Sequence, residues 1–354
     1  MAVADSLSRS GVRARTRLVE ARLWPVLAVM LAGVFCVSLG VGRFHVPIGH
    51  VFGILLSHLT PVDPFWSGVE GRVVELIRMP RLIVAGLAGG GLALAGAALQ
   101  GTFRNPLVGP QIIGVSSGAA FGGSLAIMAS DSATLLILCA FGFGLLSMAV
   151  VYGISRIGGR SPILMLVLSG VVTSAFFTAL VSLIKYLADP DDKLPAIVYW
   201  LMGSFASATY GKALVLAVTV GIGGIVIYLL RFRINLLSLG DEEAMALGVA
   251  VERTRWLIMV CVTLIVAAVV SVAGVVGWVG LVVPHIARMI AGPDNRVLLP
   301  ASALIGATYL IVIDDVARTA TAAEIPLGVI TAIIGAPVFA YLLRRTQAKG
   351  WKHD

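Results

Sequence analysis

The sequence predicts an all-α, polytopic membrane protein with about ten transmembrane helices, and its composition and hydropathy pattern are the reasons. Of 354 residues, 58% are hydrophobic and only 12% are charged, whereas soluble domains carry about 25% charged residues. Apolar runs of roughly 20 residues, the length that a helix needs to cross the hydrocarbon core, recur along the chain. Because lipid offers no water to unpaired backbone groups, these runs should be helical.

Ten apolar runs qualify as spans. The first follows several arginines, but it is about 20 residues long and no A-x-A cleavage site follows it, so we expect an uncleaved helix. Gly86 and Gly90, four apart in the second span, suit close helix packing. The eighth span is short, with Pro284 and His285 near its middle. The spans are expected at residues 22–42, 81–102, 112–130, 133–155, 162–187, 212–231, 255–275, 278–291, 297–317 and 326–344.

The basic residues set the expected orientation. With a cytoplasmic N-terminus, 18 of the 26 lysines and arginines fall in cytoplasmic segments and 8 fall outside, as the positive-inside rule requires. The sequence therefore predicts one transmembrane domain at 22–345 between cytoplasmic tails at 1–21 and 346–354.

Two connections between the spans are long. Residues 44–77 include VPIGHVFGILLSHL, whose apolar spacing suits a helix lying on the outer surface. Residues 232–254 form the longest cytoplasmic loop. Spans 2–5 and 7–10 each begin with basic residues before an apolar run and a proline-marked break, which fits an inverted repeat.

The cytoplasmic loop contains GDEEAMALGV, which predicts a short helix over residues 241–249. Three acids occupy the first turn, where they complement the positive end of a helix, and Gly248 can end it. Ala244, Met245 and Leu247 give a small apolar face. From the pattern alone, a solvated surface helix and a helix docked in a partner's groove are equally favoured. The residues concerned are Asp241, Glu242, Glu243, Ala244, Leu247, Gly248 and Val249.

Arginines gather at the outer ends of two spans. Arg78 and Arg81 flank Pro80 in the motif RMPR. Arg318 follows Asp314 by four residues, so the two can pair. These arginines either anchor the spans at the membrane interface or form an outward basic patch that recruits an acidic partner.

Residues 104–120, RNPLVGPQIIGVSSGAA, interrupt the apolar pattern. Asn105 can cap or turn the chain, and Pro106 cannot continue a helix. Polar backbone at membrane depth is tolerated only where it is buried in protein or lines a watery cavity. The stretch therefore marks either a simple turn or the wall of a path.

Motifs for catalysis are missing from the sequence. It has no P-loop, no Gly-x-Ser-x-Gly and no zinc motif, so we expect no enzymatic activity, cofactor or metal site in this chain. A proton-coupled carrier should hold an acid near mid-membrane, whereas Asp314 and Asp315 lie near the outer end of a span. A secondary transporter working alone and a non-transporting scaffold remain as alternatives.

Six motifs that are weak indicators one by one become specific when they are taken together. They are RMPR, GAALQGTFRNPLVGPQIIGVSSGAA, YWLMGSF, LGDEEAMALGV, GWVGLVVPHIAR and AEIPLGVITAIIGAPVFAYLL. Jointly they resemble the FecCD-type permeases, the membrane subunits of bacterial ABC importers for iron-siderophores, haem and cobalamin. The resemblance implies a type II ABC importer permease fold in the bacterial inner membrane and a homodimer. It also implies two ATPase subunits that bind ATP and magnesium, a periplasmic substrate-binding protein, and no nucleic-acid partner.

The resemblance further implies roles for individual residues. The helix over 241–249 matches the coupling helix that docks in the ATPase, and the three arginines match a patch that binds the substrate-binding protein. Leu107 matches a residue that narrows the path near the cytosol, and the loop from Ser161 forms the opposite side. The residues implied are Arg78, Arg81 and Arg318 for docking, Asn105, Pro106, Leu107, Ile163 and Leu164 for the cytoplasmic gate, and Ser169, Thr173, Phe176 and Phe177 as path lining.

The expected substrate is haem, moved from the binding protein to the cytoplasm by alternating access. RMPRL, IGVSSGAA and YWLMGSF look most like the haem branch of the family. Ferric siderophores and then cobalamin are the alternatives. His45, His50 and His58 in the outer connection are expected to be structural, with a transient contact to haem or iron as the alternative.

Overall fold

The computed structural model describes residues 22–61, 63–156 and 161–350, and every regular element in these ranges is a helix. The predicted N-terminal tail lies outside the described residues. A first helix spans Arg22–Gly40. The elements that follow are α2 (Ile48–Ser57), α3 (Gly68–Arg72), η1 (Val73–Arg78), α4 (Met79–Phe103), η2 (Pro110–Ile113), α5 (Val115–Ala129), α6 (Ala133–Ser155), α7 (Ile163–Leu187), α8 (Lys193–Met202), α9 (Tyr210–Leu229), α10 (Arg231–Leu237), α11 (Asp241–Ala246), α12 (Val251–Ala273), α13 (Val279–Ala291), α14 (Asn295–Thr319) and α15 (Leu327–Gly350).

Each of the ten predicted spans is confirmed as a helix. Among the described residues, seven helices are long and apolar enough to cross a membrane, while α5, α13 and α15 are shorter apolar helices. The predicted short span, α13, has 13 residues and keeps Pro284 inside it. The helix expected in the outer connection forms as α2. α15 runs on to Gly350, beyond the predicted end of its span.

Helices α8 and α10 and the start of the second span were not predicted. The helix that carries the second span begins at Gly68, because η1 continues α4 upstream as a π-helix. Pro80 has no N–H to bond the carbonyl of Leu76. The wider turn directly before Pro80 instead bonds the N–H of Met79 to the carbonyl of Val74, five residues back.

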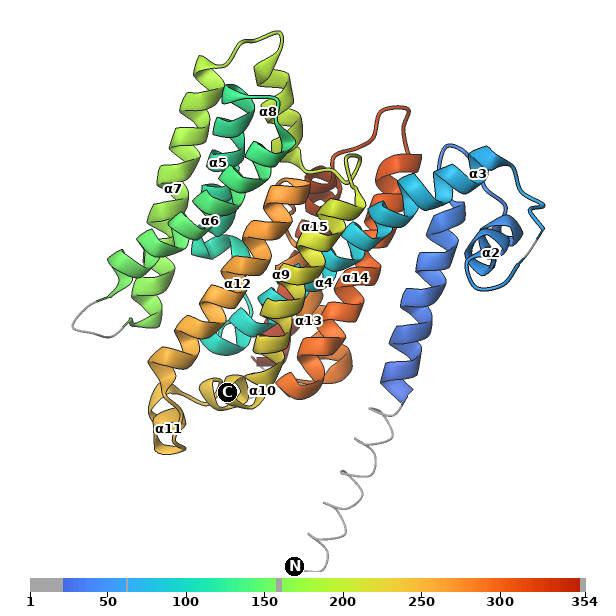
Figure 1. The fold of residues 1–354 in the computed structure, drawn as a ribbon. Helices are drawn as coiled ribbons and strands as arrows, with labels where there is room; N and C mark the ends of the chain where they lie inside the picture. The colour runs from blue at the N-terminus through green and yellow to red at the C-terminus, as the bar shows by residue number, and fades with distance from the viewer. Residues whose placement is uncertain (1–21, 62, 157–160, 351–354) are drawn as a thin grey trace, which may run out of the picture.

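Helices α4 and α12 form the centre of the molecule. In each of them 78% of the most apolar 18-residue stretch is buried, compared with 28% in α6 and α7 and 22% in α9. Figure 1 shows α4 crossing behind α9 and α12, with α7 at one edge and the first helix at the other. A helix that is apolar on all sides is expected to be surrounded by others.

Close backbone contacts join α4 to α14 and α13. A Cβ atom on Gly89 would lie 2.1 Å from the carbonyl oxygen of Gly306, and one on Gly96 would lie 1.8 Å from that of Gly280. The tight packing expected of the glycines in α4 is confirmed, since small residues let membrane helices approach closely. Gly86 contributes less, because a Cβ there would meet its nearest neighbour at 3.6 Å.

The two halves of the chain share one order of helices. α4, α5, α6 and α7 have 25, 15, 23 and 25 residues, and α12, α13, α14 and α15 have 23, 13, 25 and 24. In each half the short second helix follows a break in the backbone, at η2 and at residues 274–278. This order agrees with the inverted repeat expected from the sequence.

The helix ends form two sets at opposite ends of the molecule. At the end that we call the α11 end, Arg104 lies 3.7 Å from Asp241, and Figure 1 places α10 and α11 there. At the other end, which we call the α3 end, Arg81 hydrogen-bonds Glu324, and the figure places α2, α3 and α8 there. The alternation agrees with the predicted topology, whereas a cytoplasmic location for the α11 end stays a prediction.

Candidate functional site

The chain between α4 and α5 turns where the sequence predicted a break. Arg104 follows α4 in the left-handed conformation, with φ of 53°. The Asn105 side chain accepts a hydrogen bond of 2.9 Å from the N–H of Leu107, which is how asparagine stabilises turns. Asn105 and Pro106 are exposed, and Leu107 is 45% exposed. The turn is confirmed, and the gate role of these three residues stays a prediction.

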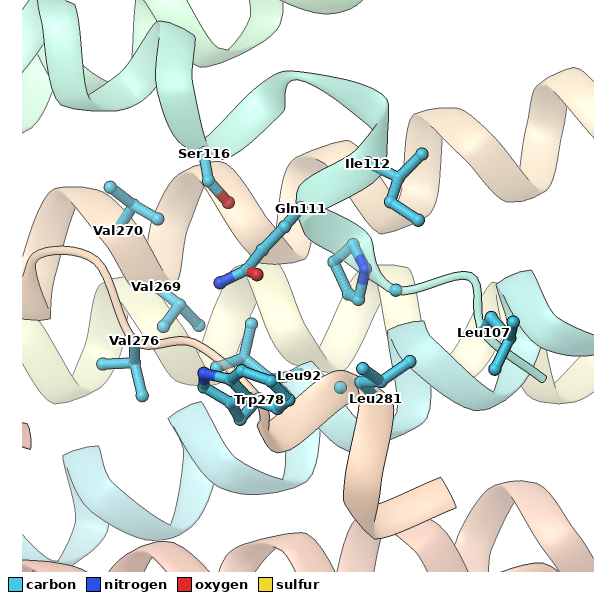
Figure 2. Close-up of a pocket in the computed structure, with 13 residues that line it drawn as sticks. Leu92, Leu107, Gln111, Ile112, Ser116, Val269, Val270, Val276, Trp278 and Leu281 are labelled. Carbon is cyan, nitrogen blue, oxygen red and sulfur yellow. The ribbon is translucent and has the colours of Figure 1, made fainter. Parts of the chain in front are cut away.

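The turn leads into a cleft between the two broken spans, which we call the η2 cleft. It has a volume of about 70 Å³ and separates η2 and the start of α5 from the break between α12 and α13. Figure 2 shows Gln111 extending toward Trp278, with Ser116 beside it and Leu107 at the far end. Trp278 has φ of 68°, a conformation that residues other than glycine rarely adopt.

A second hollow of about 330 Å³ adjoins the η2 cleft through Gln111 and Ser116. Thr178 of α7 and Val275 of the break after α12 also line it. The side chains that line the two hollows carry amide, hydroxyl and indole groups and no formal charge. Uncharged, mainly apolar walls with a few polar groups suit a path, because a solute held by them can also leave.

Three of the four residues expected on α7 as path lining face the interior of the helix bundle. Ser169, Thr173 and Phe177 are 1%, 1% and 4% exposed, whereas Phe176 is 59% exposed. The polar α7 residue at the second hollow is Thr178. None of the three buried residues lines either hollow of the single chain, and their role as path lining stays a prediction. The sequence could not select among the faces of α7, because its exposed side is as apolar as its buried side.

The other side of the predicted gate lies at the start of α7. Leu164 is 68% exposed and Ile163 is partly buried, and neither lines the η2 cleft. Gln111 and Trp278, which do line it, were not among the predicted site residues. Gln111 was detectable as a lone amide in an apolar segment, whereas an aromatic residue such as Trp278 gives no such signal.

The short helix predicted over residues 241–249 is confirmed as α11. Its three acids lie in the first turn, and Gly248 follows the helix with φ of 82°. Ala244 is buried and Val249 is 8% exposed. Met245 and Leu247 are 53% and 59% exposed, so the helix keeps two apolar side chains in the open. Docking of α11 on an ATPase stays a prediction.

Two of the three predicted docking arginines instead cap the first helix. Arg78 donates hydrogen bonds to the carbonyl oxygens of Leu39 and Phe44, and Arg318 donates to that of Ser38. The last carbonyls of a helix have no partners inside it, and cations stabilise its negative end. The arginines therefore hold the C-terminal end of the first helix against the bundle.

Arg81 lies in a buried ion cluster. Its guanidinium donates to Asp314 at 2.8 Å and to Glu324 at 2.9 Å. The three arginine residues are only 4–7% exposed. The single chain presents no exposed patch at these three arginines, because its own carboxylates and carbonyls cover the guanidinium groups. Their role in docking a binding protein stays a prediction. The predicted pair of Arg318 with Asp314 is present at 3.9 Å, although Asp315 is the closer partner.

Two of the three outer histidines, His50 and His58, contact carboxylates. Nδ1 of His50 lies 3.1 Å from Glu70, and Nε2 of His58 lies 3.4 Å from Glu75. Each pair joins α2 to the α3–η1 segment. Among the described residues no three His, Cys, Asp or Glu side chains are grouped to hold a metal ion. These contacts agree with the structural role expected for the histidines.

Two broken spans, an uncharged cleft between them and an exposed helical tip are the features of the described chain that bear on its function, and comparison with known proteins identifies its family. The sequence profile of the FecCD transport family matches residues 29–345. The chain belongs to the FecCD transport family. It is therefore a multi-pass membrane protein and a permease subunit of an ABC importer, as the sequence predicted.

Named relatives of the FecCD chain handle different solutes. A molybdate import permease of Haemophilus influenzae is 42% identical over 92% of this chain and 96% of its own length. A probable iron chelatin permease of Helicobacter pylori is 45% identical over 78% and 83%. A hemin transport permease of Yersinia pestis is 39% identical over 77% and 83%. Membership of the family therefore leaves the solute undetermined.

A solved structure confirms the fold of the FecCD chain. It is described as an inward-facing conformation of a metal-chelate type ABC transporter, with a TM-score of 0.82 and 42% identity over 92% of this chain and 99% of that chain. The prediction of a type II importer permease fold is thereby confirmed.

Proposed function

We propose that this chain is half of a homodimeric permease that imports haem by alternating access, driven by a separate ATPase. The observation that carries the proposal is the η2 cleft, where two broken spans bring neutral side chains together beside the loop of Leu107. In transporters, helices broken at membrane depth mark the place where the solute passes. The loop of Leu107 and the start of α7 would then form the gate.

A second copy would complete the path. The hollow beside Thr178 is bounded in part by α7, and a second face of this helix is exposed in the single chain. Leu168, Val172 and Phe176 on that face are 47%, 58% and 59% exposed. A homodimer that paired these faces would enclose the hollow between its two copies.

The exposed tip of α11 supports the proposal that a partner drives the cycle. A helix of six residues cannot bury Met245 and Leu247 alone, and a groove in an ATPase subunit would cover them. ATP and magnesium would bind to that partner, and this chain would perform no chemistry. The proposal places the α11 end in the cytoplasm, the chain in the bacterial inner membrane, and a periplasmic binding protein at the α3 end.

The walls of the η2 cleft carry groups that suit haem, although the cleft of about 70 Å³ must widen during the cycle before a macrocycle can enter it. Leu92, Val269, Val276 and Trp278 offer apolar contact for a macrocycle, while Gln111 offers an amide for a polar edge. A passing haem needs no permanent iron ligand, because conduction requires binding that is weak enough to reverse. The hemin transport relative supports this choice.

Molybdate is the second candidate, because a molybdate permease is similar to this chain over almost the whole length of both proteins. In the described clefts an oxyanion would meet no cation. It would be held only by amide, hydroxyl and backbone donors, so we place it after haem.

Reconstitution in proteoliposomes with the cognate ATPase and binding protein tests the proposal. Uptake of haem, a ferric siderophore, cobalamin and molybdate would be measured side by side, with and without ATP. We expect ATP-dependent uptake of haem above the other three. ATP-dependent uptake of molybdate alone would replace haem as the substrate and leave the permease function standing.

Two other outcomes would overturn the function itself. Uptake at full rate without an ATPase would indicate a secondary transporter. No uptake of any solute by a correctly assembled complex would indicate a scaffold.

A further inference from the structure

The strongest polar contact between α11 and the rest of the chain passes through Asp241. We propose that Asp241 and Arg255 form a link that ties α11 to both loops beside the proposed gate, so that displacement of α11 moves the two loops together. The inference rests on the proposed function and names the residues that transmit the motion. It makes Asp241 and Arg255 positioning residues, since neither lines the clefts.

The first arm of the link runs through α12 to the loop before α7. One Nη of Arg255 lies 2.8 Å from both carboxylate oxygens of Asp241. The other Nη donates to the carbonyl oxygen of Ser161 at 3.3 Å. Ser161 is two residues before Ile163, which begins α7. A single planar guanidinium therefore bridges α11 and the start of α7.

The second arm runs to the loop after α4. An Nη of Arg104 lies 3.7 Å from the same Asp241 carboxylate. Arg104 is the left-handed residue with which the turn toward Leu107 begins. The carboxylate thus lies between two cations. Arg255 hydrogen-bonds to the loop before α7, and Arg104 belongs to the loop after α4; these are the two loops that the proposed function assigns to the gate.

Burial distinguishes this link from an ordinary surface ion pair. The Arg255 side chain is 2% exposed, whereas Asp241 is 35% and Arg104 is 41% exposed. Glu252 on the same helix also lies 3.9 Å from the guanidinium, but Asp241 is the closer partner at 2.8 Å. Because a buried guanidinium that loses its closest carboxylate is strongly unfavourable, Arg255 is expected to follow Asp241 when α11 shifts. Within the described chain, the main packing partners of α11 are α10 and α12.

The same burial separates transmission from docking. A side chain that is 2% exposed cannot touch an ATPase subunit, so a change at Arg255 alters the link without altering the docking surface. Lysine keeps the charge, but its single ammonium cannot reproduce the planar fork that reaches Asp241 and Ser161 together. Arg255→Lys is therefore the informative variant.

The experiment measures uptake and ATP hydrolysis in the same proteoliposomes, and the amount of ATPase retained on the purified permease. For Arg255→Lys we expect the ratio of solute taken up to ATP hydrolysed to fall about five- to tenfold, a typical size for coupling between sites. Retention of the ATPase should equal that of the unaltered chain. An unchanged ratio, or a loss of uptake that only matches a loss of bound ATPase, would overturn the link.

A second variant protects the test against misfolding of Arg255→Lys. Arg104→Asn removes the other cation and places asparagine, which tolerates the left-handed conformation, at the turn. We expect the same ratio to fall, by a smaller factor, because the 3.7 Å contact is the longer one. Asp131→Asn is the matched control, since it breaks the 2.6 Å pair with Lys193 at the opposite end of the molecule, and its ratio should not change.

The two hypotheses fail in different ways. If no variant and no unaltered chain shows ATP-driven uptake, the proposed function fails. If the unaltered chain transports and both variants keep its ratio, only the link fails.

Discussion

The two ends of the molecule use arginine in opposite ways. At the α3 end, Arg78, Arg81 and Arg318 are almost fully buried and satisfied by carbonyls and carboxylates of the same chain. At the α11 end, the pair of Arg255 and Asp241 is half open, because the carboxylate is 35% exposed and faces a second, looser cation. The first arrangement fixes helices, whereas the second can change. A permease needs a rigid end and a changeable end, because a helix that moves at one end can shift the loops beside it only if the rest of the bundle stays in place.

The largest expected effect comes from breaking the fixed end. Arg81→Leu removes the closest cation from the buried Asp314 and the partly buried Glu324 and leaves only Arg318, 3.9 Å from Asp314, which should lower the free energy of unfolding by about 3–5 kcal/mol. Thermal unfolding in detergent would detect it as a large fall in Tm. Arg72→Leu, an exposed arginine earlier on the same continuous helix, should change Tm little. Equal Tm values for the two variants would contradict the buried cluster.

The cap on the first helix should matter less. Arg78→Met keeps a long apolar side chain but frees the carbonyl oxygens of Leu39 and Phe44. Leaving buried acceptors without partners costs about 1–3 kcal/mol. Hydrogen exchange should show that the variant opens faster than the unaltered chain at the end of the first helix, while exchange in α12 stays the same in both. Protection that stays unchanged would mean that water replaces the guanidinium without loss.

The fixed end should also weaken in acid. Burial opposes ionisation of Glu324, but hydrogen bonds and the charge of Arg81 outweigh it and hold its pKa below the ordinary value of 4.5. A carboxyl with a lowered pKa stabilises the fold fully above its ordinary pKa, and the stabilisation is lost as pH falls through the lowered value. From about pH 5 to about pH 3, Tm should therefore fall less in Glu324→Gln than in the unaltered chain. If Tm fell equally with pH in both proteins, the pair of Glu324 with Arg81 would not explain the loss of stability in acid.

The smallest effect on stability is expected at the changeable end. Arg104 is 41% exposed and 3.7 Å from Asp241, so Arg104→Asn should alter the free energy of unfolding by less than about 1 kcal/mol. Thermal unfolding beside the uptake assay would check this. A Tm that falls as far as in Arg81→Leu would show that the α11 end is as rigid as the other, and the contrast between the ends would disappear.

Local features were predictable from the sequence, and long-range ones were not. α11 was found because acids, a small apolar face and a glycine lie within ten residues. The turn at Asn105 and Pro106 was found for the same reason. The partners of Arg81 lie 233 and 243 residues away, so the sequence showed a basic residue at a span end but not its neutralisation.

The sequence of a membrane helix also does not show which of its faces is buried. In a soluble helix the polar face marks the outside, but α7 presents apolar residues to lipid and to the bundle alike. The sequence therefore could not show that Ser169, Thr173 and Phe177 are buried in the single chain whereas Phe176 is exposed. The central role of α4 was better signalled, because glycines at close spacing show where another backbone must approach.

The arginine cap on the first helix has a consequence for how the protein is made. The first helix is synthesised before α14, but the guanidinium that binds the carbonyl oxygen of Ser38 belongs to Arg318, 280 residues later. Until α14 has been inserted, Arg78 alone holds the end of the first helix, and the carbonyl oxygen of Ser38 lacks its guanidinium partner. The cap on this helix is thus completed only late in synthesis, and a chain interrupted before α14 would keep the Arg78 contacts without the Arg318 contact.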